Sequence, residues 1–142
     1  MILQFSIPGQ PQGKARARTV QNHHTGKTMS FTPEKTVMYE NLIKVSYLEQ
    51  CGRKKAEKDT PLCVKILAGF QIPKSASTKR ERQMLAGFLR PTKKPDADNI
   101  SKCILDALNG IAYHDDSQVT ELEVKKIYAK VPGVTVFISE MT

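Results

Sequence analysis

Apolar side chains occupy alternate positions from Val64 to Ile72, and this run limits how the chain can fold. A period of two is typical of a strand with one face on a core. The run stops at Pro73, which has no backbone N–H to donate and cannot continue a central strand. We therefore predict a long central strand that other elements must cover on its apolar face.

Three further segments alternate in the same way and are predicted strands. The first ends at the breaker pair Pro8-Gly9. The other two lie on either side of Val131-Pro132-Gly133, which has the composition of a turn, so we expect them to form a hairpin. The apolar residues that indicate the three strands are Leu3, Phe5 and Ile7, then Leu122, Val124 and Ile127, then Val134, Val136 and Ile138.

Helical spacing marks the segments between these strands. The first predicted helix has an N-cap at Thr32 and Pro33 at its first helical position, and it runs to about Cys51-Gly52. Its inward stripe is expected to be Met38, Leu42 and Val45. A second helix begins at a capping box formed by Thr78 and Glu81 and ends before Arg90-Pro91. The residues of this helix available for packing are Met84, Leu85, Phe88 and Leu89.

The third predicted helix carries a continuous apolar stripe, after which the chain order is β-α-β-α-α-β-β. The stripe consists of Ile100, Cys103, Ile104, Ala107, Leu108 and Ile111. This order predicts an α+β fold, with flanking helices on a small mixed β-sheet. At 142 residues and 39% hydrophobic content, the chain suffices for one domain over residues 1–142.

Residues 9–31 differ from the rest of the chain because they contain basic side chains, no acidic one and little apolar material. We expect them to form a mobile basic arm whose DNA contacts are Lys14, Arg16 and Arg18. The second helix adds Lys79, Arg80 and Arg82, and Lys93 and Lys94 follow it. A solvated basic face is the alternative interpretation of such residues.

Positive charge is segregated along the chain. Residues 1–95 have a formal charge of +12 and residues 96–142 one of −4, for a total of +8. This asymmetry favours a polyanionic partner such as DNA, although a basic surface that serves only solubility has the same composition.

Other sequence features indicate an intracellular protein without disulfides. The cysteines, Cys51, Cys63 and Cys103, are odd in number and lack the spacing of a zinc site. No stretch has the length of a membrane span, and the strand-like N-terminus is unlike a secretory signal. We expect a cytoplasmic location, no membrane partner and no small-molecule cofactor.

Five aspartates between residues 96 and 116 stand out in this basic chain: Asp96, Asp98, Asp106, Asp115 and Asp116. Clustered carboxylates repel one another unless a hard cation such as Mg²⁺ lies between them. If the chain after Gly110 folds back toward the start of the third helix, Asp96, Asp98 and Asp116 can converge on Mg²⁺. Lys102, one turn after Asp98, can then stabilise the charge of a phosphoryl transition state.

Structural roles are the alternatives for the same residues. Asp98 can be an N-cap, and Lys102 with Asp106 can be an ordinary i, i+4 ion pair. His114 can carry a proton or be a surface residue, and we assign it no role.

The ordered pattern of these residues resembles the signature of the RusA family of Holliday-junction resolvases. The matching parts are Asp96-Ala-Asp98-Asn99-x-x-Lys102, Asp106-Ala-Leu, and Asp115-Asp116-x-Gln118-Val119. Weaker matches are Pro8-Gly9-x-Pro11 with Lys14, Arg16 and Arg18, and Thr32-Pro33. The resemblance therefore covers most of the chain.

The resemblance implies a small α+β homodimer that requires Mg²⁺ or Mn²⁺ and resolves four-way DNA junctions by paired nicks. Asp96, Asp98 and Asp116 resemble the metal-binding catalytic aspartates, with Asp115 as a further candidate ligand, and Lys102 resembles the catalytic lysine. The chain departs from the best-known members by having Lys93-Lys94-Pro95 in place of an arginine-rich run, by a shorter spacer before the acidic pair and by an inserted basic helix.

The leading interpretation is a metal-dependent, structure-selective endodeoxyribonuclease that resolves Holliday junctions. One alternative is a nuclease of the same lineage that prefers forks, flaps or other branched DNA. The other is a non-catalytic DNA-binding module in which the acidic residues cap helices and pair with lysines. In each case the partner is DNA, and binding should weaken with salt.

Overall fold

Four strands form the main sheet at the positions that alternation predicts. The computed structural model describes residues 2–141 and gives these strands as β1 (Ile2–Pro8), β4 (Leu62–Gln71), β5 (Val119–Ala129) and β6 (Gly133–Glu140). Burial alternates along β1, where Leu3, Phe5 and Ile7 are buried, and along β6. In β4 the run from Leu62 to Ala68 also buries every second side chain, which confirms the predicted central strand.

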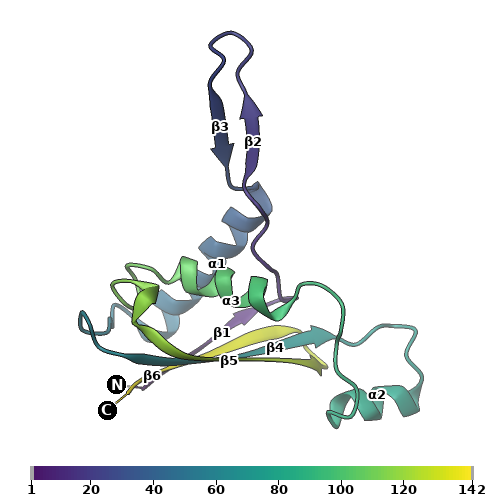
Figure 1. Cartoon of the computed structure of the whole chain (residues 1–142). Coiled ribbons are helices and arrows are strands. Elements are labelled where there is room, and N and C mark those ends of the chain that lie inside the picture. Colours follow the sequence, from purple (N-terminus) through teal and green to yellow (C-terminus); the bar gives the residue numbers. More distant parts are fainter. Residues whose placement is uncertain (1, 142) are drawn as a thin grey trace.

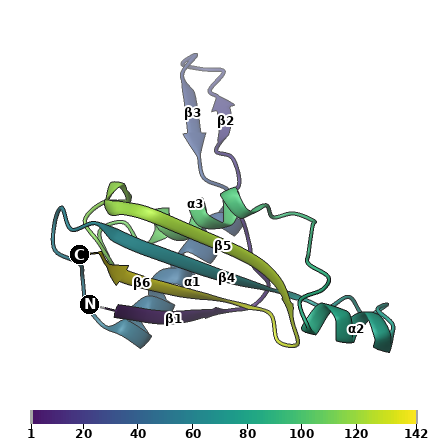
Figure 2. The same cartoon turned by 60° about the horizontal axis from the view of Figure 1, so that its bottom comes forward.

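The last two strands are not hydrogen-bonded to each other. The sheet has the order β1-β6-β4-β5, so β4 lies between β5 and β6 (Figure 2). β4 pairs in parallel with β5 and antiparallel with β6, and β6 pairs antiparallel with β1. The predicted hairpin was therefore wrong. Parallel neighbours require a crossover connection, and the helices between β4 and β5 supply it.

Two helices, α1 (Glu34–Cys51) and α3 (Ala97–Ala107), cover one face of the sheet (Figure 1). The predicted stripe of α3 is confirmed, since Ile100, Cys103, Ile104 and Ala107 are buried. Leu108 is also buried, as the C-cap, and Ile111 packs on the core from beyond the end of the helix.

The buried face of α1 differs from the predicted one. Tyr39, Ile43 and Tyr47 face the core, whereas Met38 and Val45 are 64% and 50% exposed. Tyr47 packs edge-on against Phe5 of β1, with ring centroids 5.3 Å apart. The predicted stripe was wrong because α1 carries apolar side chains on both faces, and helical spacing alone does not say which face meets the sheet.

A third helix, α2 (Thr78–Leu85), stands away from the sheet (Figure 1). Its N-cap is Ser77, whose Oγ accepts a hydrogen bond from the Arg80 N–H at 3.2 Å, so the predicted Thr78 capping box was wrong. The helix also ends earlier than predicted, before Gly87, which has φ of 85°. Of its apolar residues Met84 is buried, whereas Phe88 is 83% exposed.

The basic arm contains a two-stranded ribbon. β2 (Arg18–Gln21) pairs antiparallel with β3 (Thr28–Phe31), and this hairpin projects from the rest of the molecule (Figure 1). The turn closes through a hydrogen bond of 2.7 Å from the Asn22 N–H to the Lys27 carbonyl, with Gly26 in the left-handed region. We did not predict these strands, because each has only four residues and both are exposed, so their sequence shows no clear alternation of apolar and polar side chains.

One hydrophobic cluster joins β1, β4, β6, α1 and α3. The fold is therefore α+β, with a mixed sheet and flanking helices, and its order matches the predicted one apart from β2 and β3. Among residues 2–141, no helix combines the length and apolar character needed to cross a bilayer.

Candidate active site

The N-terminal end of α3 presents two of the predicted aspartates. Asp96 is the N-cap, and its Oδ1 accepts a hydrogen bond of 2.9 Å from the Asn99 N–H. Asp98 lies in the first turn and its side chain is exposed. The cap is thus supplied by Asp96, which removes capping as the structural role of Asp98.

Lys102 follows Asp98 by one turn on the exposed surface of α3. Within residues 2–141, neither side chain makes an ion pair or a side-chain hydrogen bond. The alternative in which Lys102 pairs with Asp106 therefore does not apply, because Asp106 has a different partner. Asp98 and Lys102 remain available to a ligand.

The partner of Asp106 is Lys14. The Nζ of Lys14 donates to Asp106 Oδ2 at 2.7 Å and lies 3.8 Å from Glu40 Oε2. The backbone N–H of Lys14 also donates to the Asn99 carbonyl, at 3.1 Å. The hydrogen bond to Asp106 is the largest cause that raises the pKa of Lys14, and burial opposes it. Lys14 therefore ties the arm to α3, and its DNA contact stays a prediction.

The backbone on either side of Lys14 is also closely packed against α1 and α3. A Cβ on Gly13 would lie 2.9 Å from the Cβ atoms of both Pro95 and Asn99. The Ala15 N–H donates to Thr36 Oγ1 at 3.1 Å. The root of the predicted arm is thus packed on α1 and α3, and the projecting part is shorter than residues 9–31.

Replacing Lys14 with methionine should lower the free energy of unfolding by about 1–3 kcal/mol, because Asp106 and Glu40 then lack their cation. Because the pKa of Lys14 is raised in the folded state, this contribution is complete below the ordinary lysine pKa of about 10.4 and is lost as the pH rises through the folded-state value. Urea unfolding at neutral pH and above pH ~11 measures both effects. Lys65→Met, at an exposed lysine on β4, is the control. Equal losses in the two variants would contradict the assignment.

The second acidic pair surrounds a short 3-10 helix, η1 (Asp116–Gln118). Asp115 caps it, and hydrogen bonds from the hydroxyl and backbone N–H of Ser117 hold the pKa of Asp115 below its usual range. Gln118 completes the capping box by accepting from the backbone N–H groups of His114 and Asp115. Asp115 therefore has a structural role in this turn, and its part as a metal ligand stays a prediction.

Asp116 is held by Asn109, which follows α3. The Asp116 N–H donates to Asn109 Oδ1 at 2.8 Å, and Asn109 Nδ2 donates to Asp116 Oδ2 at 3.4 Å. Behind them Tyr113 is buried and donates to the Leu105 carbonyl. Its pKa is raised by burial and then by the charges of Asp116, Asp106 and Asp115.

The predicted aspartates therefore form two groups at opposite ends of α3. Asp96 and Asp98 lie at its start, and Asp116 lies beside Asn109 after its end, with about 14 Å of helix between them. Within residues 2–141, no three His, Cys, Asp or Glu side chains are close enough to hold one metal ion together. Our hypothesis required the chain after Gly110 to fold back to the start of α3. In the structure it returns to the C-terminal end of α3.

The donor chemistry of these groups still suits Mg²⁺. Their ligands are carboxylate oxygens, and Mg²⁺ commonly binds one or two protein carboxylates, with water and substrate phosphates completing its shell. Asp96 and Asp98 provide two carboxylates two residues apart, and Asp98 has no ion-pair or hydrogen-bond partner among residues 2–141. They fit such a partial site, whereas a closed three-aspartate site in one subunit does not fit this geometry.

Most of the predicted DNA contacts are available for binding. Seven of the eight side chains are exposed and form no ion pair within residues 2–141: Arg16, Arg18, Lys79, Arg80, Arg82, Lys93 and Lys94. The hairpin and α2 project in different directions, and the start of α3 lies between them (Figures 1 and 2). Basic side chains therefore flank Asp98 and Lys102 on both sides.

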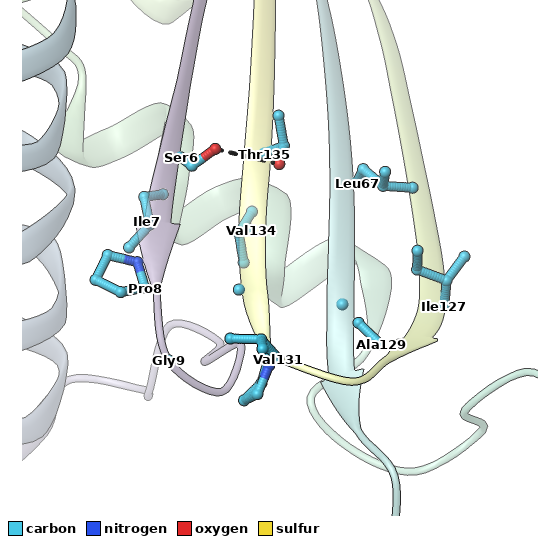
Figure 3. Close-up of a pocket in the computed structure, with 13 residues that line it drawn as sticks. Ser6, Ile7, Pro8, Gly9, Leu67, Ile127, Ala129, Val131, Val134 and Thr135 are labelled. Carbon is cyan, nitrogen blue, oxygen red and sulfur yellow. Dashed lines mark hydrogen bonds between the residues drawn. The ribbon is translucent and has the colours of Figure 1, made fainter. Parts of the chain in front are cut away.

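A hollow on the open face of the sheet, about 440 Å³ in volume, offers no comparable chemistry. Ser6, Leu67, Ile127 and Thr135 are among its lining residues (Figure 3). No acidic, basic, histidine or cysteine side chain lines it. The candidate active site is therefore the exposed surface of α3.

Two residues that position this surface had no assigned role from sequence. Asn109 holds Asp116, and Gln118 also donates to the carbonyls of Glu57 and Thr60, at 2.9 and 3.1 Å. The side chain of His114 is exposed, and only its backbone is hydrogen-bonded. The sequence Asn109-Gly110 is typical of a turn after a helix, but no local signal showed that Asn109 would bind an aspartate seven residues later.

Comparison with known proteins gives two matches. A family model described as "Endodeoxyribonuclease RusA" matches residues 8–139. The chain is also 33% identical over 143 residues to a protein of Bacillus subtilis (strain 168) named "Uncharacterized protein YqaN", covering 99% of this chain and 97% of that protein. Both matches include α3 and the acidic residues on either side of it.

Proposed function

Because this chain belongs to the RusA family of endodeoxyribonucleases, we propose that it resolves four-way DNA junctions by paired phosphodiester nicks with Mg²⁺ or Mn²⁺. The observation that carries this proposal is the surface of α3, where Asp98 and Lys102 are exposed and unpaired within residues 2–141. These two side chains are therefore available to bind a metal ion and a phosphate group.

We assign Asp96 and Asp98, at the start of α3, as the carboxylates that would hold the metal; Asp116 stays a predicted ligand from beyond the end of α3, with Asp115 as a further candidate. When bound, the divalent ion supplies Lewis-acid polarisation of the phosphodiester and of the attacking water. Asp96 keeps Oδ2 for this purpose, since its Oδ1 accepts the capping hydrogen bond. Asn109 holds Asp116 at the far end of α3 from Asp96 and Asp98. A contact between Asp116 and the metal therefore depends most on the position of the bound DNA.

Lys102 is assigned as the electrostatic helper. Its ammonium group is exposed one turn after Asp98 and has no carboxylate partner within residues 2–141. A cation in this place can neutralise the negative charge that develops on the phosphate oxygens during cleavage. A neighbouring Lys102 also lowers the repulsion between Asp98 and an approaching phosphate.

The exposed basic residues of the hairpin and α2 are proposed to bind the arms of the branched DNA. Lysine and arginine contacts to phosphates do not depend on sequence, so they suit a nuclease that recognises structure. The hairpin also carries Val20, Met29 and Phe31, all more than 45% exposed. These side chains can pack on sugars or bases beside the phosphate contacts.

A homodimer is proposed because a four-way junction has two-fold symmetry. Two equivalent nicks on opposing strands require two equivalent sites, which a two-fold dimer supplies, one from each subunit. The cytoplasm remains the expected location.

The test is cleavage of a synthetic mobile four-way junction, with Mg²⁺, Ca²⁺ or EDTA in parallel. We expect paired nicks with Mg²⁺ and none with EDTA. Forks and flaps in the same panel test the alternative substrates. Binding to all forms without any cutting under Mg²⁺ or Mn²⁺ would contradict the nuclease proposal and support the non-catalytic module.

A further inference from the structure

The outward face of α1 carries several apolar side chains that no other element within residues 2–141 covers. Its exposed members are Val37, Met38, Val45 and Leu48, which are 41%, 64%, 50% and 46% exposed. Leu42, which is partly buried, lies among them. At 100° per residue these five side chains fall within an arc of about 140° on the side opposite Ile43 and Tyr47, and the same arc holds the exposed polar residues Glu34, Asn41 and Glu49. We call this set the outer α1 stripe.

This surface is unsuited to DNA and unusual for a monomer. Phosphate contacts are made by lysine and arginine, and the outer α1 stripe contains neither. Contiguous apolar side chains on a soluble protein mark a surface that another protein covers. Apolar side chains lie on both faces of α1, which is why the inward stripe was mispredicted.

We propose that the outer α1 stripe is the surface by which two copies of this chain pair, with the two α1 helices antiparallel about a two-fold axis near Leu42. The need for two copies rests on the proposed function, whereas the location on α1 rests on this surface alone. In a two-fold interface, the same patch must complement itself.

The outer α1 stripe meets this requirement to within one residue position. Met38 precedes Leu42 by four positions and Val45 follows it by three. Val37 precedes it by five and Leu48 follows it by six. An antiparallel partner therefore brings Met38 opposite Val45 and Val37 opposite Leu48, and each pair occurs twice.

The flanking charges are complementary in the same arrangement. Lys35 and Glu49 lie seven positions before and seven after Leu42, on the same side of the stripe. Both side chains are exposed, and neither forms an ion pair within residues 2–141. A two-fold axis near Leu42 therefore places Lys35 beside Glu49 of the partner subunit, and charge pairs at this distance select the antiparallel orientation.

A groove of about 670 Å³ lies at the N-terminal end of the stripe, lined by Gln12, Glu34, Lys35, Met38, Tyr39 and Leu42. Its lining is mostly apolar side-chain surface from α1. In the antiparallel arrangement this groove faces Val45 and Glu49 of the partner subunit. A concave site for a small apolar side chain at each end completes a self-complementary interface.

The first test is sedimentation velocity without DNA, across a dilution series. We expect the wild-type chain to be a dimer, and Leu48→Glu to weaken dimerisation at least about 100-fold because two like charges enter an apolar contact. The matched control is Leu122→Glu on β5, since Leu122 is also 46% exposed but lies off the stripe, and it should leave the dimer intact. A wild-type monomer at every concentration, or a dimer that survives Leu48→Glu, overturns the proposal.

A charge exchange tests the antiparallel pairing itself. Lys35→Glu and Glu49→Lys should each weaken the homodimer about tenfold, because each creates two like-charge pairs. Mixing the two variants should restore dimerisation, since the mixed dimer has opposite charges at both positions. Absence of recovery on mixing, with both variants folded by circular dichroism, refutes the assigned pairing.

These measurements are independent of cleavage. A chain that dimerises through α1 but cuts no junction contradicts the proposed function and leaves this inference standing. A chain that cuts junctions but dimerises through another surface contradicts only this inference.

Discussion

Asp98→Asn is expected to reduce Mg²⁺-dependent cleavage of a four-way junction by at least about 1,000-fold, because a divalent ion supplies several kcal/mol of stabilisation in the transition state. The change removes one negative charge with almost no change of shape. Folding should be unaffected, because the exposed Asp98 side chain makes no hydrogen bond or ion pair within residues 2–141. Single-turnover cleavage on denaturing gels measures the rate.

Binding of the same variant should be unchanged or tighter, since removing Asp98's charge reduces its repulsion of phosphate. Gel-shift titration with Ca²⁺ measures this separately from cutting. Glu121→Gln is the matched control, because Glu121 is an exposed carboxylate on β5 outside the acidic stretch. If Asp98→Asn cuts as fast as Glu121→Gln, the metal role of Asp98 is wrong.

Parallel variants separate the two acidic groups. Asp96→Asn and Asp116→Asn should also lose cleavage, but Asp116→Asn keeps its position because asparagine can still accept or donate at Asn109. Full activity of Asp116→Asn, with loss in the other two variants, would restrict the metal site to the start of α3.

Ile43→Ala is expected to lower the free energy of unfolding by about 2–5 kcal/mol, because it leaves a cavity beneath α1. Ile43 is fully buried. The predicted inward stripe of Met38, Leu42 and Val45 would instead place Ile43 on the outside, where truncation costs little. This single substitution therefore distinguishes the two orientations of α1 by several kcal/mol.

Ile2→Ala is the control for this measurement, since Ile2 is 82% exposed, and its effect should stay within about 0.5 kcal/mol. Urea unfolding is compared at one protein concentration, because dimerisation adds to the apparent stability of both variants. Similar losses at the two isoleucines would contradict the observed packing of α1.

The predictions that succeeded from sequence depend on short-range periodicity. In β1 and β4, alternate side chains must face opposite sides of a sheet, so Leu3, Phe5 and Val64 are assigned correctly without knowledge of their partners. In α3, apolar residues occur on one face only, so the buried stripe and the exposed positions of Asp98 and Lys102 follow from the same count.

The predictions that failed concern partners distant in sequence. The ion pair of Lys14 was not predicted, because its carboxylate partner Asp106 is 92 positions away along the chain. The last two strands were paired as neighbours, yet β4 separates them. Asp116 was expected near the start of α3, but the loop after Gly110 holds it beside Asn109.

By itself, the sequence determined where most helices and strands lie. It also determined the buried face of those elements that carry apolar side chains on one face only, and the basic charges that indicate DNA binding. Only the tertiary structure decided which side of α1 meets the sheet, which strands are neighbours and which carboxylates have partners. The physical reason is that periodicity acts between residues a few positions apart, whereas strand order and ion pairing are set by the burial of surfaces that the chain brings together from remote segments.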